Sequence, residues 1–180
     1  MVFPLSLQEL ANIVIMTLAV AFIFRRAFHL DRELPFWKGM GYAALLVAPG
    51  IVLHEFGHKF VALAFGQSAT FEIAIPWLAV GIILVLVNAP VVFFVPAFIA
   101  VTGDATPLQH TLISFAGPAL NGLIYLLAWV MARRDQSRKA HTFWTYTRKI
   151  NGFLFLFNMI PFPPFDGYGV FSNILRMFGV

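Results

Sequence analysis

The sequence predicts an all-α, multi-pass membrane protein with about four transmembrane helices, and with a strand and a re-entrant hairpin between the second and third. Of its 180 residues, 60% are hydrophobic and only 11% are charged, whereas soluble domains carry about 25% charged residues. The apolar residues form runs of membrane-spanning length rather than short alternating patterns. Cysteine is absent, which excludes disulfides, thiolate metal sites and a cysteine nucleophile.

The first two expected spans cover residues 7–24 and 39–65. The first basic residue, Arg25, follows the first span, so the positive region of a signal peptide is missing. We therefore expect residues 1–28 to remain as an additional N-terminal transmembrane helix. The second span contains His54, Glu55 and His58, and ionisable residues are costly in a bilayer.

The region after the second span is less regular. Residues 71–75 alternate like a strand that ends at Pro76. Residues 78–87 are apolar but too short to span alone, and two prolines, Pro90 and Pro96, interrupt the next part of the chain. Irregular backbone at membrane depth is tolerated only where protein or a water-filled cavity covers it. The region therefore indicates a cavity, and whether residues 78–100 span the bilayer or re-enter it stays open.

The remaining expected spans cover residues 108–131 and 150–160, and an amphipathic tail closes the chain. We expect one membrane-embedded domain over residues 1–180, with a core at about 39–171. Ten of the twelve lysines and arginines lie in two segments that we expect to be loops, from Arg25 to Lys38 and from Arg133 to Lys149. Their expected partners are lipid headgroups, anionic ones favoured, and not nucleic acid.

The most informative motif is His54-Glu55-Phe56-Gly57-His58, inside the second span. Helix positions four apart share one face, so both imidazoles can reach one metal ion. A glutamate beside the first histidine is typical of zinc peptidases, where it takes a proton from the water that zinc activates. Independent placement of these residue types gives the pattern in well under about 1% of such chains. The motif therefore indicates a metal site.

A catalytic zinc ion usually has three protein ligands, so a third must come from elsewhere in the chain. Asp166 directly follows the last expected span, within Pro163-Pro164-Phe165-Asp166-Gly167. An Asp-Gly pair is also a common surface turn. Residue chemistry alone leaves the choice open between Asp166 and eight other acidic and histidine residues: His29, Asp31, Glu33, Glu72, Asp104, His110, Asp135 and His141.

Three motifs together resemble the site-2 protease family of intramembrane zinc metalloproteases. The first is the His-Glu-Phe-Gly-His segment at residues 54–58. The second, residues 158–167, matches every fixed position of the family pattern Asn-x-x-Pro-x-x-Pro-x-Asp-Gly. The third, Gly-Pro-Ala-Leu-Asn at residues 117–121, matches the family's Gly-Pro-x-x-Asn segment. They occur in the family's order and the resemblance covers about residues 39–171, without the peptide-binding (PDZ) or nucleotide-sensing (CBS) domains of many relatives.

The resemblance implies one zinc ion per chain, with Asp166 as its third ligand and Glu55 as the catalytic base. It implies cleavage of a transmembrane protein substrate within or near the bilayer, at the plasma membrane. Asn121 and Asn158 are then candidates for substrate binding, and hydrogen bonding between helices is an equal alternative for both. The strand at residues 71–75 could offer its edge to an unwound substrate.

Two questions stay open at this level. A membrane zinc transporter or a metal-binding protein could use the same His54, His58 and Asp166, although transport does not require Glu55. The orientation is also undecided, because the family places zinc toward the cytoplasm and thereby both basic segments outside, whereas the positive-inside rule predicts the reverse.

Overall fold

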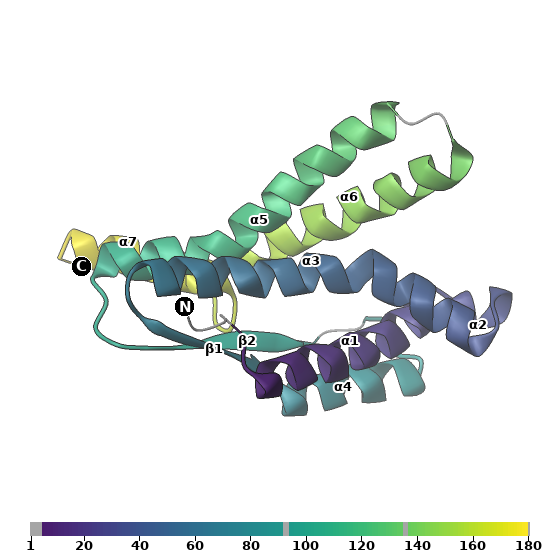
Figure 1. The fold of residues 1–180 in the computed structure, drawn as a ribbon, viewed down its shortest axis with the longest axis horizontal. Coiled ribbons are helices and arrows are strands. Elements are labelled where there is room, and N and C mark those ends of the chain that lie inside the picture. The colour runs from purple at the N-terminus through teal and green to yellow at the C-terminus, as the bar shows by residue number, and fades with distance from the viewer. Residues whose placement is uncertain (1–4, 92–93, 135–136, 180) are drawn as a thin grey trace. The chain divides into compact units, whose positions relative to one another are not determined.

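Helices dominate the computed structural model, which describes residues 5–91, 94–134 and 137–179 (Figure 1). The expected class, helical with a strand segment between the second and third spans, is confirmed. In chain order the elements are α1 (Leu7–Ala27), α2 (Leu30–Glu33), α3 (Phe36–Ala64), β1 (Ser68–Ile73), α4 (Ile75–Leu86), β2 (Ala97–Thr102), α5 (Pro107–Arg134), α6 (Arg138–Asn158) and α7 (Asp166–Met177).

Among the described residues, α1, α3 and α5 are long and apolar enough to cross a membrane. They match the first three expected spans to within a few residues. The fourth expected span, α6, is not among them. The basic segment before it was expected to be a loop, and this is wrong: Arg133 and Arg134 end α5, and α6 begins at Arg138. Four basic residues therefore lie within α6 and lower its mean hydropathy: Arg138, Lys139, Arg148 and Lys149.

The region between α3 and α5 contains a two-stranded sheet and a short apolar helix. The expected strand at residues 71–75 is β1, which begins and ends a few residues earlier, and α4 replaces the expected apolar run. The second strand, β2, was not expected, and Pro96 lies directly before it. Ala74, which follows β1, donates its N–H to the carbonyl of Pro96 at 3.3 Å. The end of β1 thus meets the start of β2, so the two strands are antiparallel.

The chain divides into two compact units, which we describe separately. The first unit comprises Met1–Ile51 and Thr70–Ala100, and so contains α1, α2, α4, the first part of α3 and most of the sheet. Here α1 packs against α4. A small apolar core forms around Ala21 of α1 and around Met40 and Ala43 of α3, all buried.

In the first unit, side chains of α1 hold the main chain of β1 at Phe71. Glu9 accepts a hydrogen bond from the N–H of Phe71 at 2.7 Å, and the amide of Asn12 donates to the carbonyl of Phe71 at 3.1 Å. Both groups of one strand residue point to the same side, here away from β2. An unwound substrate that paired with β1 at this position would therefore have to displace Glu9 and Asn12.

The second unit comprises Val52–Ala69 and Val101–Val180, and so contains the last part of α3 together with α5, α6 and α7. Within it, α5 packs against both α6 and α7. Ser137 caps α6 by accepting from the N–H of Ala140 at 3.2 Å, which explains why a helix begins in the basic segment. All residues of the metal-binding motif lie in this unit.

Candidate metal centre

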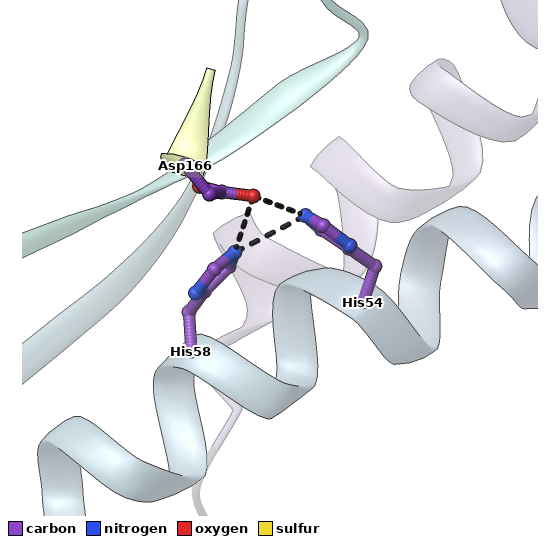
Figure 2. Close-up of side chains that lie close together, drawn as sticks. All are labelled: His54, His58 and Asp166. Atoms are coloured by element: carbon purple, nitrogen blue, oxygen red, sulfur yellow. Dashed lines mark hydrogen bonds and ion pairs between the residues drawn. The ribbon is translucent and has the colours of Figure 1, made fainter. Parts of the chain in front are cut away.

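The two histidines of the motif lie on one face of α3, one helical turn apart (Figure 2). The Nε2 atoms of His54 and His58 are 3.1 Å apart, and both residues are buried. This is the arrangement that the four-residue spacing predicts, because side chains at i and i+4 of a helix are neighbours.

Asp166 meets the histidines from the start of α7 (Figure 2). Its Oδ2 atom lies 3.0 Å from His54 Nε2 and 3.4 Å from His58 Nε2. The next residue, Gly167, has no room for a side chain, since an added Cβ would lie 2.6 Å from the carbonyl oxygen of Ile160 and still closer to Met159. Glycine is therefore required here for a close approach of two backbone segments.

Asp166 is a carboxylate at neutral pH. Burial by itself would raise its pKa, but hydrogen bonding to the imidazoles of His54 and His58, together with their charge, outweighs burial and holds the pKa well below its usual range. A carboxylate is the form of aspartate that binds a metal ion.

The Nδ1 atoms of both histidines form hydrogen bonds. His58 Nδ1 lies 2.7 Å from the carbonyl oxygen of Ile113, and His54 Nδ1 lies 2.6 Å from Oδ1 of Asn121. Each acceptor requires a proton on Nδ1, so Nε2 is the nitrogen that can bind a metal ion, which would replace the protons that attract Asp166 there. The inward atoms are then three electron-rich groups in close contact, which only protons or a shared cation can hold together.

The donor set fits zinc. Two imidazole nitrogens and one carboxylate oxygen are the ligands of many catalytic zinc sites. With bonds of about 2.0–2.1 Å, tetrahedral coordination separates the ligand atoms by roughly 3.3 Å. The separations among His54, His58 and Asp166 lie close to this value, at 3.0, 3.1 and 3.4 Å. Among the residues that the structure describes, these three form a group that could hold a metal ion.

Two glycines let α3 and α5 approach each other beside the imidazoles. A Cβ atom on Gly57 would lie 2.7 Å from the carbonyl oxygen of Ala116 on α5. A Cβ atom on Gly117 would collide with the rings of His54 and His58. Both glycines belong to the motifs of the sequence, but their packing role was not anticipated because it depends on contacts between helices.

The remaining predicted site residues have distinct surroundings. Glu55 is buried on α3, directly after His54. Asn121 is fully buried against His54, and Asn158 is a half-buried residue at the end of α6. The substrate contacts expected of Asn121 and Asn158 stay predictions.

One polar residue of the site was missed. Asn151 of α6 is buried and accepts a hydrogen bond from Asn121 at 2.9 Å. An asparagine near the start of the apolar run at residues 150–160 was the available signal, but its partner lies on another helix.

Comparison with curated proteins identifies two relatives. The chain is 31% identical over 170 residues to Putative zinc metalloprotease MJ0611 of Methanocaldococcus jannaschii, a match that covers 92% of this chain and 84% of that protein. It is 29% identical over 141 residues to Putative zinc metalloprotease Rip2 of Mycolicibacterium smegmatis, covering 70% of this chain and 54% of that protein. No family model and no solved structure matches the chain. The extent of the first match, together with the three motifs, shows that the chain belongs to the site-2 protease family of zinc metalloproteases.

Proposed function

We propose that this protein is a zinc endopeptidase that hydrolyses a peptide bond within or near the transmembrane segment of a membrane-protein substrate. The observation that carries the proposal is the convergence of His54 Nε2, His58 Nε2 and Asp166 Oδ2 within 3.4 Å of one another. Two of these atoms belong to buried residues of α3, a helix apolar enough to cross a membrane.

In the proposed reaction, His54, His58 and Asp166 hold one zinc ion per chain. Zinc with three protein ligands supplies Lewis acidity and lowers the pKa of water toward about 7. Glu55, next to His54 and buried, accepts the proton of the attacking water and then delivers it to the leaving amine. Burial strengthens these electrostatic interactions, because the surroundings screen charge less than water does.

The substrate assignment follows from the position of the motif inside a helix of membrane-spanning length. A peptide bond in a helix has its carbonyl engaged in the helical hydrogen bonds, so the substrate must unwind locally before cleavage. We place the protein in a membrane, with the plasma membrane as the proposed location. Anionic lipid headgroups are the proposed partners of the basic residues that end two of the helices, Arg25 and Arg26 of α1 and Arg133 and Arg134 of α5.

Substitution Glu55→Gln tests the proposed reaction. The variant should retain zinc, measured by mass spectrometry of the purified protein, and should lose cleavage of a co-expressed single-span substrate. Glu33→Gln changes an exposed glutamate at the end of α2 and should cleave as the native protein does. Continued cleavage by Glu55→Gln would remove Glu55 from its role.

Substitution Asp166→Asn tests the ligand assignment. Zinc content should fall in Asp166→Asn and stay unchanged in Asp104→Asn, which alters an exposed aspartate. If the native protein and Glu55→Gln moved zinc across vesicle membranes equally well, and neither cleaved the substrate, the protein would instead be a transporter.

A further inference from the structure

The hydrogen bond that orients His54 is the first of a series of three. His54 Nδ1 lies 2.6 Å from Asn121 Oδ1, and Asn121 Nδ2 donates to Asn151 Oδ1 at 2.9 Å. Asn151 Nδ2 in turn donates to the backbone carbonyl of Thr147 at 2.8 Å. The series runs from α3 through α5 to α6, entirely within the second unit.

The last member of the series determines its direction. The carbonyl of Thr147 can only accept, so Asn151 must turn its NH₂ group toward Thr147 and its oxygen toward Asn121. Asn121 must then offer its NH₂ group to Asn151, which leaves its oxygen for His54. An oxygen at that position requires a proton on His54 Nδ1, so Nε2 is the nitrogen available to a metal ion.

Burial fixes the orientation of the Asn121 and Asn151 amide groups. Asn121 is 0% exposed and Asn151 is 1% exposed, so water does not supply alternative partners. In such surroundings a reversed amide would leave polar atoms unsatisfied, which is costly. Each amide is therefore held in one orientation by its neighbours, and the orientation of Asn121 depends on Asn151.

We propose that Asn151 is a positioning residue of the metal centre, which sets the tautomer of the zinc ligand His54 through Asn121. The inference rests on the proposed zinc site and extends it to a residue that touches neither metal nor substrate. It also predicts an asymmetry, because His58 donates directly to the backbone carbonyl of Ile113 and needs no relay. Loss of Asn151 should therefore affect His54 and leave His58 in place.

Zinc affinity of Asn151→Leu, measured by chelator competition on the purified full chain, tests the proposal. Groups that orient metal ligands typically change metal affinity by 10–100-fold, and we expect about tenfold weaker binding here. The matched control is Asn173→Leu. Asn173 is also buried and donates to the carbonyl four residues earlier, that of Gly169 at 2.7 Å, but lies outside the series to His54. The zinc affinity of Asn173→Leu should lie within about threefold of that of the native protein.

A double-mutant cycle separates a relay from general destabilisation. If Asn151 acts through Asn121, then Asn121→Leu with Asn151→Leu should bind zinc no more weakly than Asn121→Leu alone. Additive losses would overturn the proposal, as would equal affinities of Asn151→Leu and Asn173→Leu. If Asn151→Leu does not fold, Asn151→Ala takes its place in the same measurements with the same expected result.

The Nδ1 proton of His54 gives a second readout. In ¹⁵N-histidine-labelled protein loaded with zinc, the Nδ1–H of His54 should exchange slowly with water, and Asn151→Leu should accelerate this exchange while the Nδ1–H of His58 is unchanged. An unaltered His54 signal would contradict the relay. If the native protein bound no zinc, both the proposed function and the relay would be contradicted. If the native protein bound zinc tightly and Asn151→Leu bound it equally tightly, only the relay would be contradicted.

Discussion

A Cβ atom built on Gly117 would lie 2.8 Å from Nε2 of His54, so the backbone of α5 passes directly against the imidazole. No side chain separates the helix from the proposed metal ligands at this point. The ring of His58 would be closer still to such an atom. The position of α5 thus limits where both imidazoles can lie.

Gly117→Ala should therefore displace the imidazoles and weaken zinc binding at least tenfold, a loss of the size seen when ligand orientation is disturbed. Zinc content and chelator competition measure the effect. Gly122→Ala is the control on the same helix, because its Cβ would be 3.5 Å from Phe155, an ordinary contact. Native zinc binding by Gly117→Ala would show that the rings adapt to the added methyl group.

Gly57→Ala should lower stability, because its Cβ would lie 2.7 Å from the carbonyl oxygen of Ala116 and force α3 and α5 apart. Overpacking of this kind costs about 1–3 kcal/mol. Thermal unfolding in detergent measures the change. Gly41→Ala on the same helix has nothing within 4 Å and should be neutral or stabilising, since alanine favours a helix. Equal melting temperatures for the two variants would contradict the contact.

Glu9→Ala should destabilise the first unit by about 2 kcal/mol, the scale of leaving a buried hydrogen-bond donor without its acceptor. Glu9 accepts from the N–H of Phe71 at 2.7 Å and from the N–H of Ser6 at 2.8 Å. Hydrogen exchange of the Phe71 amide should accelerate in Glu9→Ala and stay slow in Glu33→Ala. Unchanged exchange in Glu9→Ala would mean that another group protects this amide.

Removal of zinc by a chelator should lower the melting temperature of the native protein and zinc should restore it. A ligand present at 100 times its dissociation constant stabilises a fold by about 2.7 kcal/mol. His58→Ala lacks one of the three converging atoms and should respond little to either treatment. A chelator effect of native size in His58→Ala would place the stabilising ion elsewhere.

The local parts of the site could be predicted from sequence because they depend on helix periodicity. His54 and His58 share a face for that reason alone. Asp166 was one candidate among several on chemistry and was singled out only by the family resemblance, since its approach depends on tertiary packing. Asn151 could not be assigned, because its partner Asn121 lies thirty residues away on another helix.

The errors in the fold have similar causes. The cationic segment before α6 was expected to be a loop, although lysine and arginine are good helix formers and Ser137 provides a cap. The strand β2 was missed because Pro96 was taken to break the region. Its residues Phe98, Ile99, Val101 and Thr102 are of types that favour strands, and a proline is compatible with the position before a strand.

The positions of two proposed zinc ligands, His54 and Asp166, both depend on α6. Asn151, which orients His54, lies on α6, and the end of the same helix leads through residues 159–165 to Asp166. His58 takes its orientation from Ile113 on α5 instead. A shift of α6 along its axis would therefore disturb two of the three proposed zinc ligands, His54 and Asp166, together, and would leave His58 in place. Zinc affinity should for this reason depend on the position of α6.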